Sequence, residues 1–172
     1  MERESRYKEI IESNKDRIYR ICCGYVHDQD ERKDVYQEII INVWKSLDGF
    51  RGESRVSTWI YTIAVNTCLS YLRSETRRRK HLDPASSANM DLIPEEEHDE
   101  TREELLRSVD HLYRCINTLS PVDRALIALY LEDVSSRESA EILGISEANV
   151  RVKLHRIRKV LKGLLKEKAY GT

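Results

Sequence analysis

Residues 120–165, SPVDRALIALYLEDVSSRESAEILGISEANVRVKLHRIRKVLKGLL, decide the fold, because signals for the starts and ends of helices follow one another closely in them. Ser120 and Pro121 are typical of a helix start, since serine can cap the first turn and proline needs no N–H at the first helical position. Ser135 and Glu138 have the spacing of a capping box. This spacing predicts a second helix that begins after Ser135.

Gly144 can take the positive φ that ends the second helix, and Ser146 can cap a third. Together the three elements predict a helix-turn-helix. In the third helix, apolar residues recur at spacings of three and four and so form the buried side: Val150, Leu154, Ile157, Leu161 and Leu164. The opposite face mixes basic and small apolar residues: Ala148, Arg151, Val152, His155, Arg156, Lys159 and Lys162. Arginines can bind guanine O6 and N7, and small apolar side chains can contact a thymine methyl.

The charge of the third helix favours a nucleic-acid partner. Residues 151–168 hold eight basic residues against one acidic residue, although the whole chain has a formal net charge of only −1. The alternative is an ordinary solvated helix face. The two capped helices and the glycine turn directly before it favour DNA binding instead.

Composition places the chain among soluble helical proteins, with 172 residues, 34% of them charged and 40% hydrophobic. No run of about 18 apolar residues suggests membrane insertion, and the N-terminus lacks a signal-peptide pattern, so we expect a cytoplasmic protein. The four cysteines form no C-x-x-C pair and occupy helical apolar contexts: Cys22, Cys23, Cys68 and Cys115. We expect buried thiols and neither a metal site nor a cofactor.

The first part of the chain predicts three more helices. Apolar periodicity predicts one from Tyr7 to Tyr25 and a second from Asp30 to Leu47. On the polar side of the second helix Ile41 is the one apolar residue, which makes it a candidate contact for a partner. An exposed isoleucine with no role is the alternative.

A polar loop with two glycines, residues 48–55, precedes the third of these helices, from Val56 to about Arg79. One face of that helix carries Trp59, Asn66, Arg73 and Arg77. An aromatic ring can stack on a base and arginines can hold phosphates, so this face suits single-stranded nucleic acid. For Trp59 alone, a half-buried position in the core is the favoured interpretation.

A reversal of charge separates the two parts. Residues 73–80 hold five basic residues against one acid, whereas residues 83–104 hold nine acids against one base. Prolines and serines in the acidic segment predict a linker that can reach and partly neutralise either basic face. We therefore expect an all-α protein of two small helical domains, residues 1–80 and 103–172, joined by a flexible acidic linker at residues 81–102.

Short motifs in both domains resemble one family. In the first domain they are DVYQE at 34–38, VW at 43–44, FRGES at 50–54, STWIY at 57–61, IAVN at 63–66 and YLR at 71–73; in the second they are LSP at 119–121, AEILGIS at 140–146 and VRVKLHRIR at 150–158. These are similar to regions 2 and 4 of the extracytoplasmic-function (ECF) sigma factors of bacterial RNA polymerase. Two residues depart from the family pattern: Val56 stands where an aromatic is common, and Ser139 where an aliphatic residue is usual.

The resemblance implies a transcription initiation factor. It would bind core RNA polymerase through the β′ coiled coil and the β flap, and it would also bind promoter DNA. The resemblance further implies that an anti-sigma factor regulates it. It implies polymerase contacts at Asp34, Gln37, Glu38, Ile41 and Lys45. It implies contacts to the minus-10 element at Glu53, Ser54, Arg55, Ser57, Thr58, Asn66, Arg73 and Arg77. It implies contacts to the minus-35 element at Asn149, Arg151, Val152, His155, Arg156 and Lys159.

The sequence has two alternative interpretations. A stand-alone helix-turn-helix regulator of response-regulator type would use residues 1–100 for sensing or dimerisation and would not bind polymerase. An enzyme is disfavoured, because the sequence has no H-E-x-x-H, no P-loop and no G-x-S-x-G motif. His98 lies among acids, but a lone histidine there is more often solvated than bound to a metal.

Overall fold

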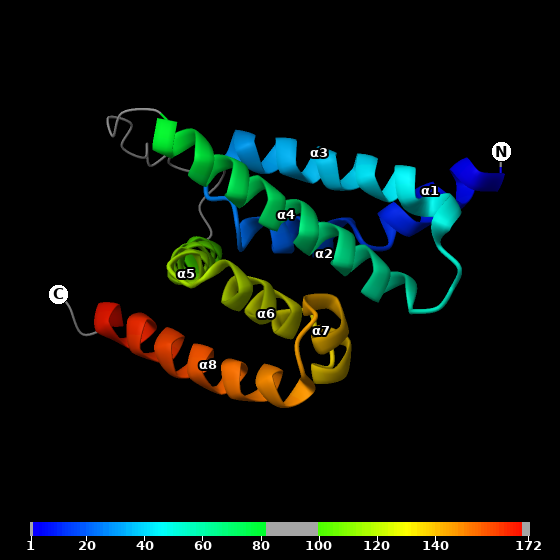
Figure 1. The fold of residues 1–172 in the computed structure, drawn as a ribbon. Coiled ribbons are helices and arrows are strands. Elements are labelled where there is room, and N and C mark those ends of the chain that lie inside the picture. The colour runs from blue at the N-terminus through cyan, green and yellow to red at the C-terminus, as the bar shows by residue number, and fades with distance from the viewer. Residues whose placement is uncertain (1, 82–99, 170–172) are drawn as a thin grey trace.

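The computed structural model describes residues 2–81 and 100–169, and within these ranges the chain is helical with no strand (Figure 1). The elements are α1 (Glu2–Glu12), α2 (Lys15–Cys23), α3 (Gln29–Ser46), the 3-10 helix η1 (Leu47–Gly49), α4 (Val56–His81), α5 (Glu100–Asn117), α6 (Pro121–Leu131), α7 (Ser136–Leu143) and α8 (Glu147–Ala169). The all-α prediction is confirmed. Residues 82–99, most of the predicted acidic linker, lie outside the described residues.

The helix predicted from Tyr7 to Tyr25 is two helices, so that prediction was wrong. The break falls at Asn14, whose φ of −128° departs from helical geometry. The Asn14 side chain is buried and donates a hydrogen bond from Nδ2 to the Ile10 carbonyl oxygen, 2.8 Å away. This bond satisfies a carbonyl at the end of α1, and asparagine commonly forms such local bonds in place of helix. The chain can therefore change direction between α1 and α2.

The α3 and α4 helices pack along each other and form the centre of the first half (Figure 1). Asp28 caps α3 by accepting hydrogen bonds from the backbone N–H groups of Asp30 and Glu31. Residues of both helices are fully buried where they meet: Val35, Ile39, Val43, Ile60, Ala64 and Val65. The predicted apolar arc of α3 is thus its core side.

In the second half the helix ends have the predicted chemistry. Ser120 accepts a hydrogen bond from the Asp123 N–H, and Ser135 and Glu138 form a complete capping box at the start of α7. Gly144 adopts φ 65°, the left-handed conformation that ends α7. Val150, Ile157 and Leu161 of α8 are buried against α5 and α6. The helix-turn-helix is therefore present as predicted.

One cluster of buried apolar residues contains side chains from both halves of the chain. Ala125, Ala128 and Leu129 of α6 and Ile142 of α7 are buried in the same cluster as the core of α2, α3 and α4. A second cluster holds the remaining apolar residues of the second half, among them Leu126 and Ile127. Residues 125–129 are all buried, so α6 contacts apolar partners on two sides. This helix joins the two halves.

The described residues contain four free and buried cysteines, as predicted, and no group of histidine, cysteine and carboxylate side chains that could hold a metal ion. No helix among residues 2–81 and 100–169 combines the length and the apolar character that a bilayer crossing requires.

Candidate nucleic-acid and polymerase-binding surfaces

The exposed face of α8 carries the predicted minus-35 residues. All six are solvent-exposed on the side of the helix away from its buried stripe: Asn149, Arg151, Val152, His155, Arg156 and Lys159. Two contacts to α6 fix the helix: Lys153 pairs with Asp123 at 2.9 Å, and Arg158 Nη1 donates to the Tyr130 hydroxyl at 3.3 Å. Arg151 pairs with Glu147 one turn earlier. Arg156 is therefore the better placed arginine for an incoming base.

The polar face of α3 carries the predicted polymerase residues, all of them exposed: Asp34, Gln37, Glu38, Ile41 and Lys45. The Ile41 side chain is 49% exposed, although its neighbours Ile39 and Val43 are fully buried. Ile41 thus contributes little to the core. An apolar side chain among charged ones is the arrangement found where a partner covers the surface.

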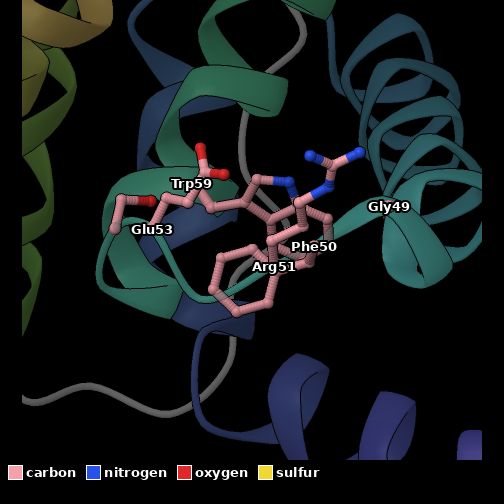
Figure 2. Close-up of a pocket in the computed structure, with 6 residues that line it drawn as sticks. Gly49, Phe50, Arg51, Glu53 and Trp59 are labelled. Atoms are coloured by element: carbon pink, nitrogen blue, oxygen red, sulfur yellow. The ribbon is translucent and has the colours of Figure 1, made fainter.

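The loop between α3 and α4 forms a small open pocket (Figure 2). Its lining residues are Gly49, Phe50, Arg51, Glu53, Ser54 and Trp59. The rings of Phe50 and Trp59 lie 4.8 Å apart between centroids and are tilted by 32°, and Gly52 turns the loop with φ 75°. Trp59 is half-buried, which agrees with the interpretation favoured from the sequence, a half-buried position in the core. Aromatic walls beside an arginine can stack an unpaired base and hold its phosphate.

The sequence predicted only part of this pocket. Glu53 and Ser54 were expected to contact the minus-10 element and Trp59 to lie on a face suited to nucleic acid, whereas Phe50 and Arg51 were given only within the family motif FRGES. The available signal was the spacing of the chain's only phenylalanine from Trp59 across a glycine-containing loop.

The remaining predicted minus-10 residues do not gather at the pocket. Asn66, Arg73 and Arg77 are exposed and share one side of α4, because their spacings of seven and four residues are close to whole helical turns. At a rise of about 1.5 Å per residue, Arg77 lies roughly 27 Å along the helix from Trp59. They form a track that leads away from the loop, suited to a phosphate backbone.

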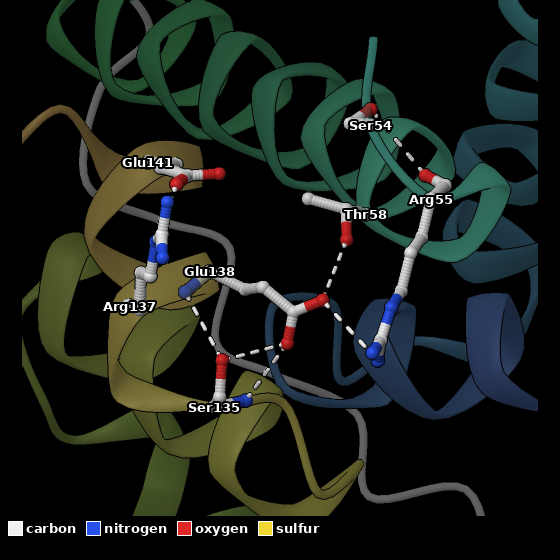
Figure 3. A network of polar contacts seen from close by, with 7 residues as sticks. All are labelled: Ser54, Arg55, Thr58, Ser135, Arg137, Glu138 and Glu141. Atoms are coloured by element: carbon white, nitrogen blue, oxygen red, sulfur yellow. Dashed lines mark hydrogen bonds and ion pairs between the residues drawn. The ribbon is translucent and has the colours of Figure 1, made fainter. Parts of the chain in front are cut away.

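Thr58 lies in a contact between the two halves (Figure 3). It is only 6% exposed, and its hydroxyl donates to Glu138 Oε1 of α7 at 3.1 Å. Arg55 Nη1 is 3.7 Å from the same oxygen, although the Arg55 side chain is 82% exposed. Hydrogen bonds from Ser135 are the main cause that lowers the pKa of Glu138, with Thr58 and Arg55 adding to the effect against the opposing effect of burial.

A second polar contact joins the halves at the end of α6. Glu132 binds Arg20 of α2 through both oxygens and lies 3.8 Å from Arg17, and its side chain is 5% exposed. The hydrogen bond to Glu132 raises the pKa of Arg20. Nearby, the Tyr25 hydroxyl donates to the Pro121 carbonyl at 3.2 Å. Gly24 faces Ala128 and Ile116 so closely that an added Cβ would lie 3.9 Å from each.

Comparison with known families and proteins gives matches in both halves. The family model of sigma-70 region 2 matches residues 10–78, and that of sigma-70 region 4 matches residues 110–161. The ECF RNA polymerase sigma-E factor of Escherichia coli is 34% identical over 137 residues, which cover 74% of this chain and 70% of that protein. The ECF sigma factor SigW of Bacillus subtilis is 25% identical, over 95% of this chain and 91% of its own length.

Two solved structures share the fold. The sigma factor RpoE of Bartonella quintana, in complex with the anti-sigma factor NepR, superposes with a TM-score of 0.73 at 20% identity and covers 95% of this chain and 96% of its own. CnrH, in complex with the cytosolic domain of CnrY, superposes with a TM-score of 0.66 at 19% identity, covering 95% and 90%.

Proposed function

We propose the following residue roles from the premise that this chain belongs to the extracytoplasmic-function sigma factors, the family to which both of its halves match. As a sigma factor it binds core RNA polymerase and directs promoter-specific initiation of transcription. Residues 1–80 act as region 2, residues 103–172 as region 4, and residues 81–102 as the acidic linker between them.

Region 2 docks on the β′ coiled coil of core polymerase through the polar face of α3. The observation that carries this role is Ile41, an exposed apolar residue ringed by Asp34, Gln37, Glu38 and Lys45. Burial of one such side chain in the centre of an interface can supply a large share of the binding energy. Region 4 adds the contact to the β flap.

The two promoter elements are bound at different surfaces. The exposed face of α8 enters the major groove at the minus-35 element, and Arg156 supports this role because its side chain is exposed and makes no hydrogen bond or ion pair with the described residues 2–81 and 100–169. The loop before α4 captures an unpaired base of the minus-10 element, which stacks on the adjoining rings of Phe50 and Trp59. Asn66, Arg73 and Arg77 follow the backbone of the same strand along α4.

The other partner is an anti-sigma factor, since the superposable sigma factor RpoE was solved in complex with one. We place the protein in the cytoplasm, where its polymerase is, and assign it no catalytic activity of its own. The alternative of a stand-alone regulator is not favoured, because the region 2 model matches residues 10–78, which that alternative treats as a sensor domain.

Copurification tests the proposal directly. A tagged chain mixed with bacterial core polymerase should elute with it on size exclusion, and the complex should start transcripts from a subset of genomic fragments that core alone does not transcribe. A chain that binds duplex DNA tightly but never elutes with core polymerase would instead be the stand-alone regulator.

A further inference from the structure

We propose that region 4 closes over Thr58, beside the minus-10 loop of region 2, and keeps this residue away from DNA, and that Glu132 and Glu138 are the residues that hold the two halves in this closed form. The inference rests on the proposed role of the loop in promoter binding. It assigns the helix-turn-helix a second task, as an inhibitor built into the same chain.

Glu138 occupies the place of a DNA phosphate at the loop. Its carboxylate accepts the Thr58 hydroxyl and lies near the Arg55 guanidinium, two groups assigned to promoter DNA (Figure 3). A carboxylate engages such donors as a phosphate oxygen does. The capping box already fixes the Glu138 side chain through Ser135, so closure costs little side-chain entropy. DNA and Glu138 cannot hold Thr58 at the same time.

Glu132 makes the stronger of these two polar contacts between the halves. It is almost fully buried and binds Arg20 with both oxygens, with Arg17 beside it. The Glu132 carboxylate is shielded from water although both arginine side chains are 48% exposed, and a carboxylate left buried without its partner is costly. Apolar contacts of Ala125, Ala128, Leu129 and Ile142 with region 2 reinforce the closed form. Separation of the halves therefore exposes apolar area and breaks the polar contacts of Glu132, Glu138 and Tyr25 together.

The closed form leaves the two other surfaces free. The polar face of α3 and the outer face of α8 are exposed in it. Figure 1 shows α3 on the side of α4 opposite to α6, α7 and α8. Core polymerase can thus dock on α3 before the halves part, whereas Thr58 becomes available to DNA only afterwards.

The test uses the full chain without polymerase. Glu132→Lys places a like charge beside Arg17 and Arg20 and should open the molecule. Small-angle scattering measures the radius of gyration, and fluorescence anisotropy measures binding to a labelled single strand of about twelve mixed-sequence nucleotides. If about nine-tenths of the wild-type molecules are closed, opening should strengthen binding roughly tenfold. Glu141→Lys, the same change on the exposed side of α7, is the control and should leave the radius unchanged.

Two further variants separate these two polar contacts from general charge effects. Arg20→Glu combined with Glu132→Arg restores an opposite-charge pair and should return the radius and the affinity toward wild type. Glu138→Gln keeps the capping box, which accepts glutamine, but removes the charge, and it should raise DNA affinity more than Glu141→Gln does. Circular dichroism confirms that each variant is folded.

The proposal is overturned if folded Glu132→Lys expands without gaining DNA affinity, or if wild type is already as expanded as this variant. Should Glu132→Lys fail to fold, equal affinities of Glu138→Gln and Glu141→Gln overturn it. These assays contain no polymerase, so a failure of the proposed polymerase binding is seen separately, in the copurification.

Discussion

The two surfaces assigned to promoter DNA are presented differently by the same fold. The α8 face is exposed along its length, and its helix is held from behind by Val150, Ile157 and Leu161. At the minus-10 loop, by contrast, Thr58 is buried against Glu138 of the other half. A surface fixed by its own domain is ready to bind, whereas one covered by a neighbouring domain depends on where that neighbour lies. The predictions below test this difference.

The largest expected effect follows from Leu129→Ala. Leu129 is fully buried in the cluster that spans both halves, and removal of such a side chain commonly costs about 2 to 5 kcal/mol. Both tryptophans, Trp44 and Trp59, lie in the first half, so their fluorescence monitors that half alone in a urea titration. We expect Leu129→Ala to shift the tryptophan-detected midpoint strongly. The control Ile157→Ala, in the second cluster, should shift it less; equal shifts would mean that the halves unfold as one unit regardless of contact.

Ile41→Glu should weaken binding to core polymerase by about 1 to 3 kcal/mol, because it removes apolar area from the docking face. The melting temperature should change little, since the side chain is already 49% exposed. Val160→Glu is the matched control, with the same exposed fraction on α8. A pull-down with core enzyme and a thermal melt measure both quantities. A large drop in melting temperature with unchanged binding would place Ile41 in the core instead.

Arg156→Ala should change the base preference at the minus-35 element, since a bidentate arginine contributes about 1 to 3 kcal/mol of discrimination. Arg151→Ala should do so less, because Arg151 already pairs with Glu147. Lys162→Ala should weaken binding to all DNA sequences alike and make that binding less dependent on salt concentration, as expected for a phosphate contact. Transcription from a randomised minus-35 library distinguishes these results. Equal losses on matched and scrambled elements for both arginines would exclude base recognition.

The smallest effect concerns pH. The pKa of Glu138 is lowered in the folded chain, mainly by the hydrogen bond with Ser135. Its ionised form therefore stabilises the fold above the unfolded pKa of about 4.3, and this contribution disappears as the pH falls through the lower folded value. The difference in melting temperature between wild type and Glu138→Gln should shrink as the pH falls below about 4.3. A difference that stays constant over this range would show that the charge of Glu138 contributes nothing.

Local signals predicted the second half well. The caps at Ser120 and Ser135 and the glycine at 144 depend on residues within a few positions of one another, so the sequence contains all of the relevant chemistry. Periodicity also placed Ile41 outside the core of α3. The same periodicity continued through Asn14, and the break there was missed because it depends on a side chain that bonds its own backbone.

Contacts between distant residues could not be predicted in this way. Thr58 and Glu138 are 80 positions apart, and Arg20 and Glu132 are 112 apart. No pattern along the chain pairs them, since each lies in a polar context that also suits an exposed residue. The apolar run at 125–129 was the available sign that α6 has two covered sides. The pocket was missed in part for the same reason, because Phe50 and Trp59 meet only when the loop folds.

The close approach at Gly24 offers a way to set the ratio of closed to open molecules by volume alone. A Cβ there would lie at an ordinary contact distance of 3.9 Å from Ala128 and Ile116, but only 3.3 Å from the Ile21 carbonyl oxygen, so alanine reaches the other half without a clash there and requires a small shift within its own helix. Valine, leucine and phenylalanine would each extend further into the contact between the halves, and they would push the halves apart by increasing amounts because a close-packed interior is hard to compress. Because Gly24 has φ −69°, the backbone accepts any of them. A series of side chains of increasing size at this one position would raise the fraction of open molecules step by step without changing any charge.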